Sequence, residues 1–299
     1  MERRRFLKQA TLTAAVMAFI KGEVFSAPAN RRDFNFKEIR NGVGYFTEQG
    51  GTIAWLNAKT GYAVVDSQFP NTAVNLIQEL KNLGDKPIKY LLNTHHHGDH
   101  TGGNIAFKGI VEHIVAHQNA LVNHKLAAEK ANNVDKQLFA TTTFGKGWRA
   151  PLGDERIEAY YYGSGHTNGD VVYHFQNANI AHMGDLMFNR RFPFIDKENG
   201  AHIGNWITIL DTVVKQFDGD TIFIFGHAKD PQQITGNKAD ILAFRNYLDS
   251  LLIFVQKEIT AGKPLSEILK ATTIPGAPEW TGDGIQRSLN AAYTELTAR

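Results

Sequence analysis

The densest group of potential metal ligands in this 299-residue chain lies within residues 93–104, which read NTHHHGDHTGGN. Imidazole nitrogens are the commonest transition-metal ligands in proteins, and carboxylates add oxygen ligands. In an extended backbone His95 and His97 point to the same side and could hold one ion. The glycine that follows allows a bend that would present Asp99 and His100 to a second ion.

Three further candidates each lie next to a glycine and near the end of a predicted strand. His166 lies in the loop GHTNGD, Asp185 in the triplet MGD, and His227 in the pair GH. Each signal is weak alone, but loops after strands commonly carry functional groups that converge at one edge of a sheet. The pattern therefore predicts a metal site at such an edge.

The remaining sequence predicts the elements that would position this site. Strands are expected at 34–39, 45–47, 52–57, 62–65, 88–92, 110–116, 156–162, 171–175, 180–183 and 221–225, and helices at 72–83, 118–131, 206–217, 241–259, 265–271 and 284–298. The polar, Thr-rich segment 132–151 is expected to be a surface loop. Two groups of strands mixed with helices indicate two packed sheets with helices outside, within one α/β domain.

The order H-x-H-x-D-H, G-H-T, G-D and G-H resembles the metallo-β-lactamase-fold superfamily over residues 42 to 227. The resemblance implies a four-layer αβ/βα sandwich with the site at one edge. It also implies the following ligand set: His95, His97 and His166 for the first metal, Asp99, His100 and His227 for the second, and Asp185 bridging both. Asp66, at the end of a predicted strand, would support the metal loop from behind.

This resemblance implies a metal-dependent hydrolase with two divalent ions. Zinc is expected first, but iron and manganese accept the same ligands. A hydroxide bridging the ions would attack the carbonyl of an ester, thioester or lactone, and Asp99 would orient it and accept its proton. The alternatives are β-lactam hydrolysis, iron-dependent redox chemistry and, less consistent with a complete ligand set, metal binding without catalysis. A Cys nucleophile is excluded because the chain has no cysteine, and the serine-hydrolase pattern G-x-S-x-G is absent.

The composition of the N-terminus predicts the location of the protein, and the charge of the remaining chain bears on its partners. Residues 1–29 contain a basic start, an apolar stretch and a small-residue end, which is typical of an export signal. The run RRRFLK resembles the twin-arginine motif, so we expect the twin-arginine export machinery as a partner and a periplasmic or secreted bacterial protein. The rest, 30–299, carries 27 basic and 28 acidic residues, which argues against nucleic-acid binding. The apolar run is too short for a stable membrane anchor, and a small-molecule substrate is expected.

Two segments outside the ligand pattern carry further expectations. The stretch after Asp185 contains Phe188, Arg190 and Arg191, which could contact an apolar, anionic substrate. Alternatively, both arginines could pair with nearby acidic residues while the phenylalanine packs in the core. Residues 238–299 are predicted to form a helical extension that packs on the sandwich and could wall the substrate cleft or form a dimer contact.

Overall fold

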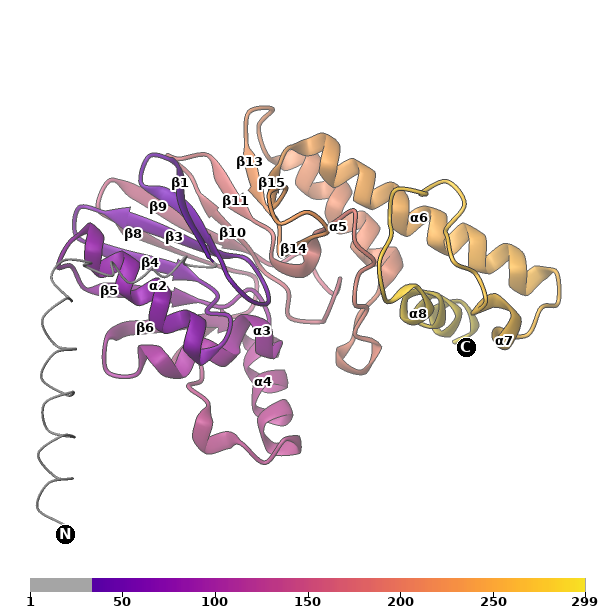
Figure 1. Ribbon diagram of the computed structural model, residues 1–299, viewed down its shortest axis with the longest axis horizontal. Coiled ribbons are helices and arrows are strands. Elements are labelled where there is room, and N and C mark those ends of the chain that lie inside the picture. The colour runs from indigo at the N-terminus through magenta and orange to yellow at the C-terminus, as the bar shows by residue number, and fades with distance from the viewer. Residues whose placement is uncertain (1–33, 299) are drawn as a thin grey trace, which may run out of the picture. The chain divides into compact units, whose positions relative to one another are not determined.

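Two β-sheets packed face to face form the centre of the fold, and helices cover the outer face of each sheet (Figure 1). The computed structural model describes residues 34–298. The predicted export signal and its boundary at residue 29 lie outside these residues. No helix among residues 34–298 combines the length and apolar character needed to cross a membrane.

The first sheet has seven strands in the order β1-β2-β3-β4-β5-β6-β7. Its elements are β1 (Asn35–Arg40), β2 (Val43–Thr47), β3 (Ile53–Ala58), β4 (Gly61–Val65), α2 (Pro70–Leu83), β5 (Ile88–Leu92), α3 (Gly98–Thr101), η1 (Gly102–Phe107), β6 (Val111–His117), α4 (Gln118–Lys130), η2 (Val134–Lys136) and β7 (Thr142–Phe144). Strands β4 to β7 run parallel, so the carboxyl ends of β4 and β5 meet at one edge.

The second sheet has six strands in the order β15-β13-β11-β10-β9-β8. The elements of this half are β8 (Gly147–Leu152), β9 (Glu155–Tyr160), β10 (Val172–Phe175), β11 (Ile180–His182), η3 (Gly184–Leu186), β12 (Phe188–Asn189), η4 (Lys197–Asn199), α5 (Ile203–Gln216), β13 (Ile222–Ile224), β14 (His227–Ala228) and β15 (Thr235–Gly236). Strand β13 runs parallel to β11, while β12 and β14 form a separate small pair.

Alternating side chains on the central strands explain the layers. Along β3, Ala54 and Leu56 join the core between the two sheets, whereas Ile53 and Trp55 pack beneath α2 on the outer face. This period of two is expected for a strand buried on both faces. A third core lies outside the second sheet, where Trp206 of α5 packs with apolar residues of the later helices. The expected four-layer αβ/βα sandwich is confirmed.

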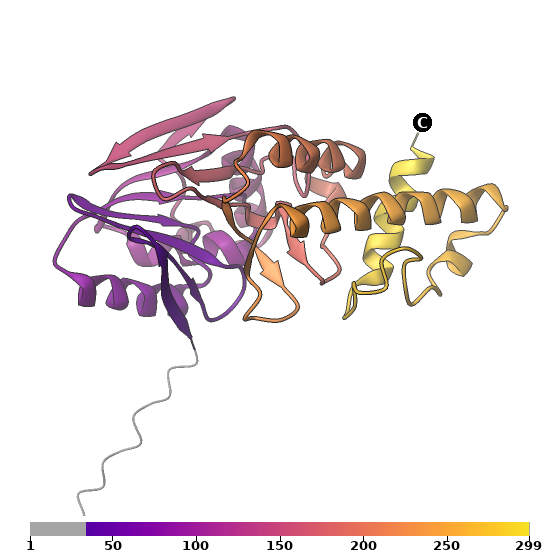
Figure 2. The ribbon, with the colours of Figure 1, turned by 90° about the horizontal axis from the view of Figure 1, so that it is seen from above.

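The C-terminal helices pack on the second half of the sandwich. They are α6 (Lys238–Thr260), α7 (Leu265–Ile268) and α8 (Ile285–Thr297), and α8 crosses α6 (Figure 2). A carboxylate of α8 also links this helix to α5. Glu295 accepts hydrogen bonds from the backbone N–H groups of Ile203 and Gly204 at the start of α5. The first turn of a helix has unpaired N–H groups that favour an anion.

One prediction about the fold is wrong. Residues 132–151, expected to be a loop, contain β7 and most of β8. Both strands lie at sheet edges, and along β8 only Ala150 and Leu152 are buried. An edge strand that buries so few side chains shows little apolar alternation, so the polar composition resembles a loop.

Candidate metal centre

The candidate ligands follow the carboxyl ends of neighbouring strands. His95 and His97 follow β5, and the helix α3 directly after them carries Asp99 and His100. Asp185 lies in η3 just after β11. The loop between β9 and β10 carries His166, and β14 begins at His227. The sheet topology therefore gathers residues that are far apart in the sequence.

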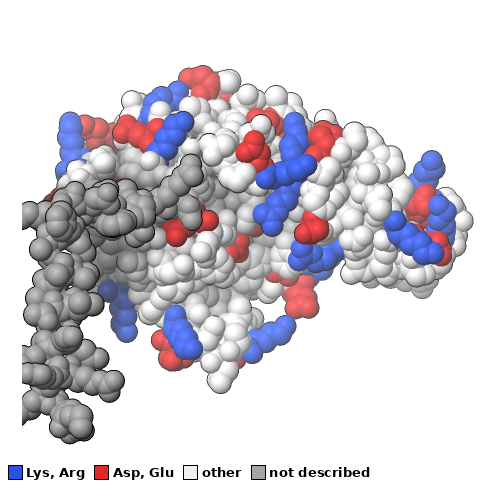
Figure 3. Space-filling view, in the orientation of Figure 1, with Lys and Arg blue, Asp and Glu red and all other residues white. Residues whose placement is uncertain are grey.

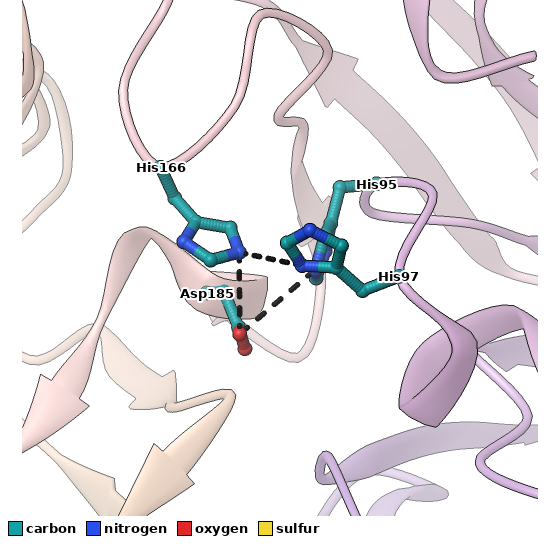
Figure 4. A group of neighbouring side chains, drawn as sticks. All are labelled: His95, His97, His166 and Asp185. Carbon is teal, nitrogen blue, oxygen red and sulfur yellow. Dashed lines mark hydrogen bonds and ion pairs between the residues drawn. The ribbon is translucent and has the colours of Figure 1, made fainter. Parts of the chain in front are cut away.

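Three imidazoles and one carboxylate converge on a single point (Figure 4). The Nδ1 atom of His97 lies 3.0 Å from Nε2 of His95 and 2.9 Å from Nε2 of His166. The Oδ2 atom of Asp185 lies 3.5 Å from Nε2 of His166. Nitrogens about 2.0–2.1 Å from one tetrahedral ion would stand slightly further apart than this, at about 3.4 Å. These four side chains could thus hold one ion after a small adjustment.

A second set faces the other oxygen of the same carboxylate. Oδ1 of Asp185 lies 3.1 Å from Nε2 of His100 and 3.4 Å from Nε2 of His227. Nε2 of His227 in turn lies 3.2 Å from Oδ2 of Asp99. Asp185 therefore stands between the two sets with one oxygen toward each, which is the arrangement that a bridging ligand requires.

Hydrogen bonds behind His166 and His97 leave the inward-facing nitrogens of these two rings free of protons. His166 Nδ1 donates to the carbonyl of Phe194 at 2.7 Å, and His97 Nε2 donates to Oδ2 of Asp196 at 2.8 Å. A neutral imidazole carries one proton, so each donation leaves the other nitrogen as a potential ligand. These tautomers follow from the hydrogen-bond network.

Asp66 organises the remaining imidazoles from the end of β4. Its Oδ1 accepts the backbone N–H of Thr94, and its Oδ2 accepts the Thr94 hydroxyl and Nδ1 of His100. Because the hydroxyl donates to Asp66, its oxygen is free to accept the Nδ1 proton of His95, 3.0 Å away. Asp66 thus orients His100 directly and His95 through Thr94. It is fully buried and has a left-handed backbone, φ +66°, a strained conformation that is typical of functional sites.

The buried site is suited to a positive charge. Burial alone would raise the pKa of Asp185, but the neighbouring His227 and His100 hold it well below its usual range. Burial likewise opposes protonation of His227, yet Asp185 and Asp99 raise its pKa to about 9. Burial lowers the pKa of His166 to about 3. The carboxylates thus stay ionised. Protons on two of the histidines balance this negative charge, and bound cations could take the place of these protons.

Unpartnered atoms and close packing also fit a cation. Oδ1 of Asp185 and Nε2 of His100 are buried and lie 3.1 Å apart, yet neither makes a well-aligned hydrogen bond, although buried polar atoms are normally satisfied. Glycines line part of the site and leave no room there for a side chain. A Cβ on Gly226 would lie 2.2 Å from Oδ1 of Asp185. A Cβ on Gly51 would lie 2.2 Å from the His100 ring. The donor set of nitrogens and oxygens suits zinc, iron or manganese.

Comparison with known protein families identifies the family of this chain. The sequence profile of the metallo-beta-lactamase superfamily matches residues 47–227, a span that holds Asp66 and every candidate ligand. The chain belongs to the metallo-beta-lactamase superfamily. The expectation of a metal-dependent hydrolase is confirmed at this level.

Relatives in the superfamily are named for different activities. A metallo-beta-lactamase type 2 of Bacillus sp. (strain 170) is 26% identical over 196 residues, covering 64% of this chain and 72% of its own. A hydroxyacylglutathione hydrolase of Erythrobacter litoralis (strain HTCC2594) is 37% identical over 101 residues, covering 34% of this chain and 35% of its own. The sequence relationship thus leaves the substrate open.

Solved structures show the same fold. A metallo-beta-lactamase from Pontibacter korlensis matches with a TM-score of 0.59 at 20% identity, covering 72% of this chain and 99% of its own. A double mutant of the sec-alkyl sulfatase PisA1 matches with a TM-score of 0.67 at 13% identity, covering 88% of this chain and 50% of its own.

The tentative substrate residues lie in different surroundings. Phe188 is buried, and its ring stacks on His227 with centroids 5.3 Å apart. The guanidinium carbon of Arg190 lies 4.7 Å from the Trp280 ring centroid, and Arg191 forms a backbone bridge with Thr281. Among residues 34–298 neither arginine forms an ion pair with an acidic neighbour. Phe188 thus packs against the candidate ligand His227, and Arg190 packs against the C-terminal extension.

Sequence reasoning missed three supporting residues. Thr94 links His95 to Asp66, the carbonyl of Phe194 fixes His166, and Asp196 fixes His97. Thr94 could have been found, because it directly precedes the histidine run. The other two lie in an irregular loop with no periodic signal.

Proposed function

We propose that this protein is an exported dinuclear metal-dependent hydrolase that cleaves a carbonyl ester, thioester or lactone. One observation carries the proposal. The two carboxylate oxygens of Asp185 face two separate ligand sets, His95, His97 and His166 on one side and Asp99, His100 and His227 on the other. Zinc is the proposed metal, because imidazole and carboxylate groups are its usual ligands at catalytic sites, although iron and manganese accept the same donors.

The chemistry of such a site follows from its residues. Divalent cations bound there would polarise the substrate carbonyl and lower the pKa of water. The side chain of Asp99 is 31% exposed, whereas those of His100 and His227 are at most 10% exposed. Asp99 is thus the accessible carboxylate that can orient the attacking water and accept its proton. The buried carboxylate of Asp185 and the fixed imidazoles keep the geometry rigid.

A substrate panel tests this proposal. Metal-loaded protein is assayed with a thioester, a lactone, a carboxylic ester, nitrocefin and a phosphodiester, before and after exhaustive chelation. We expect hydrolysis of a carbonyl substrate that chelation abolishes and added metal restores. His95→Ala and Asp185→Ala should abolish it, whereas Asp211→Ala on α5 serves as the matched control. Activity that survives chelation, or cleavage of the phosphodiester alone, would contradict the proposal.

β-Lactam hydrolysis is the second candidate. The similarity to the Bacillus metallo-beta-lactamase type 2 favours it, since that match covers most of the relative. Turnover of nitrocefin well above that of the thioester, lactone and carboxylic ester would select this candidate. Metal analysis separates both hydrolases from an iron-dependent redox protein, because a site filled with iron rather than zinc would favour redox chemistry.

Export is a separate proposal that rests on residues 1–29. The basic start and the RRRFLK run in this segment support passage through the twin-arginine machinery to the periplasm. Sequencing the N-terminus of protein recovered from a bacterial periplasm tests it. A mature start after Ala29 would support export, and recovery with Met1 intact would contradict cleavage.

A further inference from the structure

A cavity of about 560 Å³ lies beside the metal centre and is lined by four separate parts of the chain. His97 and Gly98 of the metal-binding loop form one wall, and residues 194–199 form the next. The remaining walls come from α4 and from the exposed face of α8, including Arg287. Helix α8 lies beyond residues 47–227, the span that matches the superfamily, so this cavity combines the common site with a segment outside that match.

The cavity continues the open side of the metal centre. His97 and Asp99 are the most exposed candidate ligands, with side chains 17% and 31% accessible. Gly98 stands between them, is exposed, and a Cβ placed on it would meet no atom within 4 Å. A substrate whose carbonyl lies at Asp99 can therefore extend over Gly98 into the cavity without displacing protein atoms.

The wall of the cavity changes from aromatic to cationic with distance from the metal centre. The ring of Phe194 lies 5.4 Å from that of His97, and the guanidinium carbon of Arg287 lies 5.6 Å from the Phe194 centroid. Phe194 is 40% exposed, so its face can contact a ligand. An apolar surface that ends in a guanidinium suits a ligand with an apolar body and a terminal anion.

Arg287 is the lining cation whose charge is uncompensated. Lys130 pairs with Glu198 at 3.4 Å, and Lys197 pairs with Glu295 at 2.9 Å. Asp196, which also lines the cavity, accepts a hydrogen bond from His97. Within the part of the chain that the structure describes, no ion pair includes Arg287. Its planar fork of donors is thus available for a carboxylate.

We propose that this cavity binds the part of the substrate remote from the reacting carbonyl, and that Arg287 selects substrates with an apolar tail ending in a carboxylate. The proposal rests on the proposed function, because it assumes a carbonyl substrate at the metal centre. It narrows the substrate class to acyl compounds that carry a second, anionic end.

Two matched esters test this selection. The para-nitrophenyl monoester of suberic acid has a free terminal carboxylate, and its methyl ester has the same length without the charge. We expect wild-type protein to show a higher kcat/KM for the acid. Arg287→Gln should lower the acid-to-methyl-ester ratio of kcat/KM by about 2- to 5-fold, because Arg287 is exposed and an exposed ion pair contributes modestly. Arg287→Lys should retain part of the preference, and Arg149→Gln on β8 is the control for an exposed arginine elsewhere.

A second variant tests the route into the cavity. Gly98→Leu should lower the ratio of kcat/KM for the suberate monoester over para-nitrophenyl acetate, because the new side chain fills the open space between Asp99 and the cavity. Metal content and melting temperature are measured for every variant, so that a loss from unfolding is recognised.

The outcomes separate the two proposals. Metal-loaded wild-type protein that hydrolyses none of these esters would contradict ester hydrolysis, and this inference with it. Hydrolysis of para-nitrophenyl acetate without preference for the suberate monoester would overturn the inference alone. An acid-to-methyl-ester ratio that Arg287→Gln leaves at the wild-type value would also overturn it.

Discussion

The Nε2 atom of His97 lies 2.8 Å from the Oδ2 atom of Asp196, a residue 99 positions further along the chain. The backbone N–H and side-chain amide of Asn199 also donate to this carboxylate, which is largely buried. Asp196 is therefore held in place before it accepts the imidazole proton. Its contact turns Nδ1 of His97 toward the other candidate ligands.

Replacing this carboxylate should weaken metal binding. Asp196→Asn removes the negative charge that orients the His97 ring and makes this ring a more basic ligand. Loss of such a supporting group typically lowers metal affinity about 10- to 100-fold. Competition with a chromogenic chelator measures the affinity, and Asp211→Asn on α5 is the control. Equal affinities for the wild type and Asp196→Asn would show that Asp196 does not position the ligand.

Close backbone approach to Asp185 leads to a second prediction. In Gly226→Ala the added methyl group would lie 2.2 Å from Oδ1 of Asp185, so either the backbone or the carboxylate must move. We expect a loss of about 1–3 kcal/mol in the free energy of unfolding, together with a lower metal content. Urea denaturation and elemental analysis measure the two effects.

The matched control is a glycine with free space around it. Gly219 has no atom within 4 Å of an added Cβ, so Gly219→Ala should change neither measurement. If Gly226→Ala also behaves as the wild type, the packing around Asp185 is looser than the structure indicates.

Glu295 gives a prediction of pH dependence away from the metal ligands. Burial acts to raise its pKa, but hydrogen bonds from Gly204 and Ile203, together with Lys197, lower it below its ordinary value of 4.5. A carboxylate with a lowered pKa in the folded state stabilises the protein above the pKa of the unfolded chain. This contribution is lost as the pH falls from about 4.5 through the folded value.

The variant Glu295→Gln should therefore be less stable than the wild type near pH 7, by roughly 1–2 kcal/mol. The difference should shrink as the pH falls below 4.5. Urea unfolding at a series of pH values measures it, with the exposed Glu279→Gln as the control. A difference between the wild type and Glu295→Gln that does not depend on pH would contradict a role for the ionised carboxylate.

Much of this architecture is predictable from local patterns. The observed limits of strand β5, 88–92, match the prediction, because a short apolar run ends where the polar segment 93–104 begins. The candidate ligands could be found because His and Asp next to glycine at strand ends are unusual as packing material. The fold then brings them together through parallel strands, which local sequence does not encode.

Other features could not be predicted for physical reasons. The contact of His97 with Asp196 depends on how a loop of irregular structure folds back, and no periodicity marks such a loop. The edge strands β7 and β8 bury too few side chains to show an apolar pattern. Arg287 is exposed on a C-terminal helix, so its place beside the metal centre emerges only when α8 packs on the sandwich.

Metal stoichiometry tests the central claim most directly. Protein folded with excess zinc and then desalted is analysed for metal per chain, as the wild type and as Asp185→Asn. The account predicts close to two ions for the wild type and at most one tightly bound ion for Asp185→Asn, because Asp185 is the carboxylate among residues 34–298 that faces both ligand sets. A wild-type content of one ion or fewer under saturating metal, or two ions retained without the Asp185 carboxylate, would contradict a dinuclear centre bridged by this residue.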